Sequence, residues 1–231
     1  MKKIVFFFIV LITPLLFYLF FRTNSHPSLQ LPIYFPEEVR KIIVDGKEKT
    51  DTVYHTIPPF RFVNQLGDTV TEKYFQDKTY VANFFFSTCP SVCPKMMSQM
   101  ERVNTLIQDI PETFIISHSV NPAHDSVPVL AEYAKSIHAD SKNWMLVTGK
   151  KKEIYDIAID GYKLGVDEDV RSPGGFLHSE MFVLVDKDKR IRGYYNGTDS
   201  TQVDKLIQDI KMLRTEYEPN NTPSDLIQTH Q

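Results

Sequence analysis

The sequence predicts an α/β domain that follows an N-terminal membrane anchor. Segments with the apolar pattern of buried strands alternate with segments in which apolar residues recur at helical spacing. The first central strand, Val81–Phe86, is followed by the only two cysteines of the chain, Cys89 and Cys93, and then by a helix. A β-α-β-α-β-β-α order with both thiols at this strand-to-helix turn is a thioredoxin-like arrangement.

The elements behind this prediction follow one another along the chain. A small hairpin over 60–70 precedes the first central strand, and Asp125-Ser126 and Asp199-Ser200 are typical of residues that cap a helix N-terminus. The remaining expected strands are Phe114–Val120, Trp144–Val147, Met181–Val185 and Ile191–Tyr195, and the expected helices begin near Cys93, after Asp125-Ser126, after Thr148-Gly149 and after Asp199-Ser200.

The N-terminus is typical of an uncleaved anchor, over residues 1–22. The apolar run Ile4–Phe21 is long enough to span a bilayer, and no small-residue cleavage site follows it. Lys2 and Lys3 precede the run and only Arg22 follows it, so the N-terminus is expected in the cytoplasm. We therefore expect a single-pass protein of the cytoplasmic (inner) membrane whose domain faces the extracytoplasmic, periplasmic side. A cleaved signal peptide is the alternative.

Composition divides the rest of the chain into three parts. Residues 23–55 contain scattered prolines and charges and are expected to be a spacer with a short strand at Ile42–Val44. Residues 56–216 are long enough for one domain, and the polar residues 217–231 are expected to be a disordered tail. A net charge of -3 provides no basic field for nucleic acid.

The spacing of Cys89 and Cys93 indicates redox or metal chemistry. At a helix start, backbone N–H groups and the helix dipole favour thiolate over thiol, and positions four apart on one turn face the same way. The two sulfurs can therefore close a disulfide or, with one imidazole, form a trigonal site that suits Cu(I). A structural disulfide is the alternative, although a bridge across so short a loop restrains the unfolded chain little.

Of the seven histidines, His178 is the best candidate for that imidazole. It ends a loop that contains Gly174-Gly175 and directly precedes the strand Met181–Val185, so it is expected at the same sheet edge as the cysteines. A loop histidine bonded only to backbone is the alternative. His118, at the end of the second central strand, is the runner-up.

Three stretches match motifs of a known family: residues 84–94, with Cys-x-x-x-Cys-Pro, residues 119–126 and residues 176–186. On these stretches the chain resembles the Sco/SenC family of membrane-anchored copper chaperones, over about residues 58–197. The resemblance implies that Cys89, Cys93 and His178 bind one copper ion. It also implies a partner, the copper-containing subunit of a respiratory cytochrome c oxidase, to which the protein delivers copper or whose cysteines it reduces.

One position departs from the family pattern, and two other functions compete with this one. Asn121 stands where the family usually has Asp, which removes a carboxylate near the site. A thiol–disulfide oxidoreductase acting on extracytoplasmic proteins, with Cys89 as nucleophile and Cys93 as resolving thiol, is the alternative. A peroxiredoxin-like peroxidase is excluded, because Phe86 and Ala82 occupy the positions where its motif needs Ser or Thr and Pro.

Overall fold

The computed structural model describes residues 13, 30–44, 46–139, 142–165 and 179–217. Leu31–Gln231 forms a compact unit of its own, distinct from Met1–Gln30. The predicted anchor at Ile4–Phe21 lies outside the described residues apart from Thr13, and the predicted tail lies outside them apart from Tyr217. Within the described part of the chain, no helix has the length and apolar character needed to cross a membrane.

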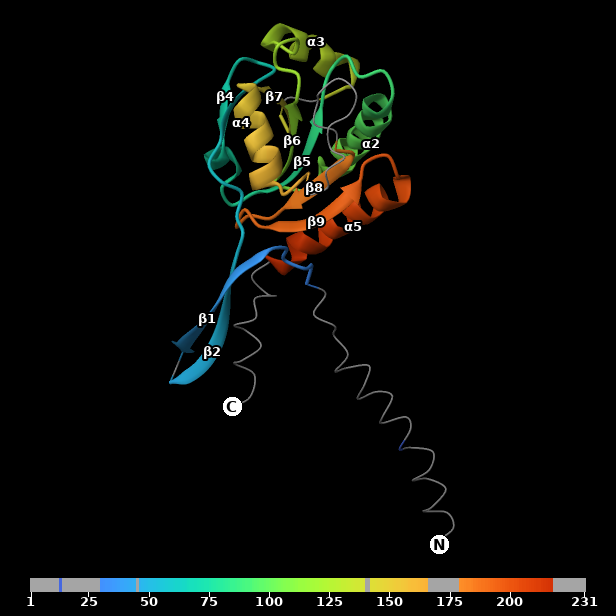
Figure 1. Cartoon of the computed structure of the whole chain (residues 1–231). Coiled ribbons are helices and arrows are strands. Elements are labelled where there is room, and N and C mark those ends of the chain that lie inside the picture. The colour runs from blue at the N-terminus through green and yellow to red at the C-terminus, as the bar shows by residue number, and fades with distance from the viewer. Residues whose placement is uncertain (1–12, 14–29, 45, 140–141, 166–178, 218–231) are drawn as a thin grey trace, which may run out of the picture. The chain divides into compact units, whose positions relative to one another are not determined.

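A seven-stranded mixed sheet in the order β4-β3-β7-β6-β5-β8-β9 is the centre of the domain (Figure 1). Strands β5, β6 and β7 are parallel to one another, whereas β3, β8 and β9 each run antiparallel to a neighbour. The carboxyl ends of the three parallel strands therefore meet at one edge. The strands are β3 (Arg61–Asn64), β4 (Thr69–Thr71), β5 (Thr79–Phe85), β6 (Thr113–Ser119), β7 (Trp144–Thr148), β8 (Met181–Val185) and β9 (Ile191–Asn196).

Helices cover both faces of this sheet and enclose two hydrophobic cores. One core takes buried side chains from α2, α3 and α5, and the other takes them from the 3₁₀ helix η1, from α4 and from the π-helical turn η2. Each core also contains alternate side chains of the central strands, as expected for strands that are buried on both faces. The helices are η1 (Glu72–Phe75), α2 (Val92–Ile107), α3 (Val127–Ser136), α4 (Lys151–Asp156), η2 (Ile157–Gly161) and α5 (Ser200–Glu216).

The order of the elements in the domain agrees with the sequence prediction, and the starts of the helices agree with it in part. Asp199 caps α5 as expected, because its carboxylate accepts a hydrogen bond from the Thr201 N–H at 2.9 Å. Ser126, the residue at the N-cap of α3, makes no side-chain cap bond, and the neighbouring Asp125 is used elsewhere. Lys150, rather than Thr148-Gly149, directly precedes α4.

The range expected to be a spacer contains an antiparallel hairpin. Strand β1 (Pro36–Val44) pairs with β2 (Lys47–Tyr54) along almost its whole length, where we expected one short strand at Ile42–Val44. At its base, the N–H of His55 donates to the carbonyl of Phe35 at 2.9 Å. The hairpin is a two-stranded sheet separate from the seven-stranded one (Figure 1).

Candidate metal centre

The two cysteines lie on the turn that joins β5 to α2. Cys89 is in the turn, three residues before the first residue of the helix, and only Cys93 is in the first helical turn. The expectation that both lie on one helical turn is therefore wrong in detail. Their closeness is nevertheless preserved, because the Cys93 N–H points at the sulfur of Cys89, with an N–S distance of 3.4 Å. Both are free thiols, 7% and 2% exposed.

The environment of the turn shifts the pKa values of the two thiols in opposite directions. Burial by itself raises the pKa of the Cys89 thiol, but the backbone N–H groups of residues 91–93 stabilise its thiolate, so that its pKa lies below the usual value. Burial raises the pKa of Cys93 to about 12, and the nearby sulfur of Cys89 and carboxylate of Asp125 add to this effect. At neutral pH, Cys89 is therefore the nucleophilic thiol and Cys93 holds its proton.

This asymmetry predicts selective alkylation. In the reduced protein at pH 7, we expect iodoacetamide to modify Cys89 and to leave Cys93 almost untouched, because the reagent reacts with thiolate. The rate at Cys89 should rise with pH and level off below the pH at which an ordinary thiol does so. Peptide mass spectrometry after timed quenching measures both rates. Equal rates at the two cysteines would contradict the geometry, and unfolding in urea, as a control, should make the rates equal.

A buried carboxylate lies beside the cysteine turn, at the carboxyl end of the neighbouring strand β6. Asp125 is 0% exposed and accepts four hydrogen bonds. The donors are the Ser87 N–H (3.1 Å), the Ser87 hydroxyl (2.5 Å), the Ser119 hydroxyl (2.5 Å) and Nδ1 of His124 (2.9 Å). These four contacts engage both carboxylate oxygens and fix the orientation of the Asp125 side chain.

Asp125 thereby ties the end of β5 to the end of β6. It holds Ser87, and the N–H of the preceding residue, Phe86, stabilises the thiolate form of Cys93. Sequence reasoning missed this role because it assigned Asp125 to a helix cap. A carboxylate shortly after the end of a parallel strand next to the cysteine strand was the signal that could have identified it.

Asn121, the residue that departs from the family pattern, lies in the same loop. The Asn121 carbonyl accepts hydrogen bonds from the N–H groups of His124 (3.0 Å) and Asp125 (2.9 Å), and the Asn121 N–H donates to the Ser119 hydroxyl (3.2 Å). The backbone of Asn121 thus shapes the turn that presents Asp125. The carboxylate beside the cysteine turn is supplied by Asp125 rather than by position 121.

His118 does not belong to this centre. Its ring lies in the core on the α4 side of the sheet, stacked on Phe84 with ring centroids 4.8 Å apart and packed edge-on against Phe62. It is 0% exposed, its Nδ1 has no hydrogen-bond partner among the described residues, and burial lowers its pKa to about 3. His118 is therefore a neutral core histidine, which removes the runner-up ligand.

The third predicted ligand, His178, lies outside the described residues. Within residues 30–44, 46–139, 142–165 and 179–217, no group of three or more His, Cys, Asp or Glu side chains is placed to hold a metal ion. The two sulfurs fit a soft metal by their chemistry and closeness, but they need a donor from elsewhere to complete a three-coordinate site. The assignment of His178 to that position stays a prediction.

Known proteins share both the sequence pattern and the fold of this chain. It is 29% identical over 175 residues to the SCO1 protein homolog of Bacillus subtilis, covering 74% of this chain and 89% of the relative. A structure of BsSco, described as a member of the Sco family of cytochrome c oxidase assembly proteins with a disulfide switch, has a TM-score of 0.61 and 30% identity, over 70% of this chain and 94% of that one.

Copper is present in a further similar structure. Yeast Sco1 with copper bound matches with a TM-score of 0.54 and 25% identity, over 75% of this chain and 94% of that structure. The SCO1/SenC family model matches residues 48–215, which include the cysteine turn, the Asp125 loop and the position of His178. The family model covers most of this chain, and the two thiols lie where β5 leads into α2. The chain therefore belongs to the SCO1/SenC family.

Proposed function

We propose that this protein binds copper through Cys89, Cys93 and His178 and delivers it to the copper centre of a respiratory cytochrome c oxidase, or reduces the cysteines of that centre. The observation that carries the proposal is the pair of buried free thiols on one turn, with the Cys93 N–H 3.4 Å from the Cys89 sulfur. Thiolates select Cu(I) over hard cations. The copper bound to yeast Sco1 and the assembly role of BsSco support the same conclusion.

The two thiols contribute differently to copper binding. Cys89 is the readier thiolate and would take the ion first. Cys93 has to lose its proton on binding, so copper uptake releases a proton and strengthens as pH rises. Both sulfurs lie in a core cluster that contains three methionines of α2, and this apolar shell limits water around the bound ion. His178 would supply the third donor, from a loop outside the described residues.

The proposal includes an extracytoplasmic location. Residues 4–21 would hold the protein in the cytoplasmic membrane as a single span, with the domain on the periplasmic side. The partner would be the copper-containing oxidase subunit, and a donor tethered in the same membrane meets it at a raised effective concentration.

A copper titration of the reduced full chain tests this function. Under anaerobic conditions we expect one copper ion per chain. His178→Ala should weaken binding by about 10–100-fold or more, since even partners of metal ligands are worth that much. Formation of the Cys89–Cys93 disulfide should be almost unchanged. His138→Ala is the matched control, because that imidazole is exposed and bonded to Glu101 at 2.8 Å, and it should bind copper like the wild type.

One observation favours a second function, thiol–disulfide exchange on extracytoplasmic proteins. The lowered pKa of Cys89 and the raised pKa of Cys93 are the arrangement that exchange needs. The Cys89 thiolate would attack a target disulfide, and Cys93 would then resolve the mixed disulfide, leaving the target reduced and the Cys89–Cys93 pair oxidised. Robust reduction of insulin, unaffected by His178→Ala and without copper binding, would establish this function in place of the first.

A further inference from the structure

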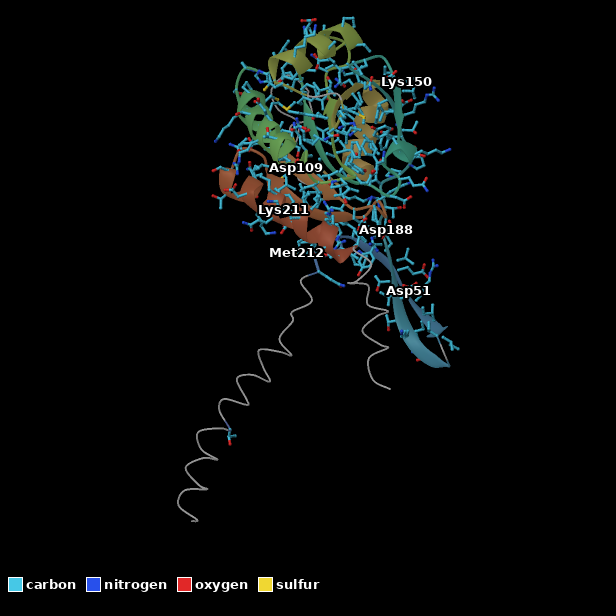
Figure 2. All side chains as sticks on the ribbon, turned by 180° about the vertical axis from the view of Figure 1, so that it is seen from behind. Asp51, Asp109, Lys150, Asp188, Lys211 and Met212 are labelled. Atoms are coloured by element: carbon cyan, nitrogen blue, oxygen red, sulfur yellow. The ribbon has the colours of Figure 1, made fainter. Side chains whose placement is uncertain are left out.

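Strand β1 has an open edge. Among the residues that the structure describes it pairs only with β2, so that within this part of the chain one side of each strand of the hairpin has no strand beside it. Figures 1 and 2, which view the molecule from opposite sides, both show the hairpin clear of the helices, with Asp51 on β2 labelled in Figure 2. Val39 is 65% exposed and Ile43 is 77% exposed. An exposed strand edge of this length is a template for pairing with another strand.

The alternation of the ladder shows which groups face the open edge. Val44 and Lys47 close a hairpin with a two-residue loop and form its first hydrogen-bonded pair. Pairs alternate from there, so the N–H and C=O groups of Ile43, Lys41 and Val39 are not bonded to β2 and point outward. A second strand can therefore form hydrogen bonds with β1 centred on Val39 without disturbing the hairpin.

The sequence of β1 is complementary to itself in the antiparallel direction. Around Val39 the order is Glu37, Glu38, Val39, Arg40, Lys41. When two copies run antiparallel about Val39, Glu38 of each lies opposite Arg40 of the other. Opposite charges directly across a strand pair stabilise it, whereas parallel pairing would place like charges together. A bulge at Pro36–Glu38 confines the regular pairing to Glu38 and the residues after it.

We propose that two copies of this chain dimerise through antiparallel pairing of β1 with β1 about Val39. The resulting four-stranded sheet has a two-fold axis at Val39, so the contact is closed and does not propagate. Pairing of β1 with β2 of another copy would leave free edges and form open chains. Strand β2 has a similar order of charges, Lys49-Thr50-Asp51, but it has the polar Thr50 at the centre of that order, where β1 has the exposed apolar Val39. Charge complementarity together with the exposed apolar Val39 and Ile43 thus selects a second copy, bound by β1, as the occupant of this edge.

The surface belongs to a part of the chain outside the family match. The SCO1/SenC model begins at residue 48, so β1 lies entirely before it. A single short strand buries little area, and the dimer should be weak in dilute solution. Tethering of both copies in one membrane would raise their effective concentration, and this part of the argument rests on the proposed anchor.

Sedimentation equilibrium of the full chain in detergent, over a wide concentration range, tests the dimer. We expect a monomer–dimer equilibrium in the wild type. Glu38→Lys and Arg40→Glu should each weaken it at least tenfold, because each places like charges opposite each other twice. Both side chains are more than half exposed, so neither variant should disturb the fold. An equimolar mixture of the two variants should dimerise again, as should the double variant Glu38→Arg with Arg40→Glu.

Lys49→Glu is the matched control. It makes the same change in charge on β2, opposite Ile42 and one strand away from the open edge, and should leave the dimer intact. A wild type that is monomeric at all concentrations would overturn the proposal, as would dimers that ignore the charge changes, since these would form through another surface. Failure of mixing to restore the dimer would also overturn it. None of these results depends on copper binding, so the dimer and the proposed function can fail separately.

Discussion

Replacement of either cysteine by serine should abolish tight copper binding. For Cys93→Ser we expect a loss of affinity beyond the roughly 10–100-fold that removal of a ligand's partner costs, because a ligand itself is lost. A hydroxyl is a hard, weakly acidic group and does not replace a thiolate on Cu(I). The same loss is expected for Cys89→Ser. Competition of the reduced full chain with a Cu(I) chelator of known affinity measures the effect.

A neighbouring serine provides the control for this experiment. Ser91 lies between the two cysteines, is exposed, and makes no side-chain bond to the helix that it precedes. Ser91→Ala should therefore bind copper like the wild type. Cys93→Ser buries a hydroxyl in place of a thiol, so circular dichroism has to show that the domain is still folded. A folded Cys93→Ser protein that keeps stoichiometric, tight copper binding would remove Cys93 from the site.

Burial explains which parts of the fold could be predicted from the sequence. The central strands β5 and β6 are apolar on both faces, and α5 buries Val203, Leu206 and Ile210 on one side, so their patterns are strong. Strand β1 is exposed along almost its whole length, and its charges do not alternate with apolar residues. Without a buried face the period-two signal disappears, and so the hairpin was expected to be a spacer.

The candidate site was predictable where it depends on local sequence and not where it depends on distant contacts. Cys89 and Cys93 are close because they share one turn. Asp125 reaches that turn only because β6 lies beside β5, a neighbour relation that no local pattern encodes. The same limit applies to His118. Its position near the end of a strand does not tell which face of the sheet its side chain occupies. The packing of Phe62 and Phe84 around it decides this.

A second large effect is expected at Arg192, whose guanidinium is buried at the other end of the domain. It donates to the carboxylates of Asp186 (3.1 Å) and Glu216 (2.6 Å) and to the carbonyls of Leu31 (2.7 Å) and Pro32 (3.1 Å). The second carboxylate oxygen of Glu216 accepts from the Leu31 N–H at 2.6 Å. This cluster joins the end of α5 and strand β9 to the point where the N-terminal segment meets the domain.

Arg192→Met should destabilise the domain by about 3–5 kcal/mol, because it breaks a buried ion pair and leaves Glu216 without its cation, whereas Asp186 keeps its ion pair with Arg190 at 3.0 Å. Urea unfolding of the full chain, followed through the fluorescence of the buried and only tryptophan, Trp144, measures the change as a lower midpoint. Lys152→Met is the control, since its ion pair with Asp156 is on the surface, and it should leave the midpoint unchanged.

A second variant separates loss of the charge network from simple loss of packing. Glu216→Gln in the Arg192→Met background should recover part of the stability, because it removes the carboxylate that Arg192→Met leaves without a cation. If Arg192→Met alone had no effect, the buried cluster would not hold Leu31 and Pro32 to the domain. Leu31 and Pro32 are the residues through which the chain enters the domain, and the cluster fixes this entry point against β9 and α5.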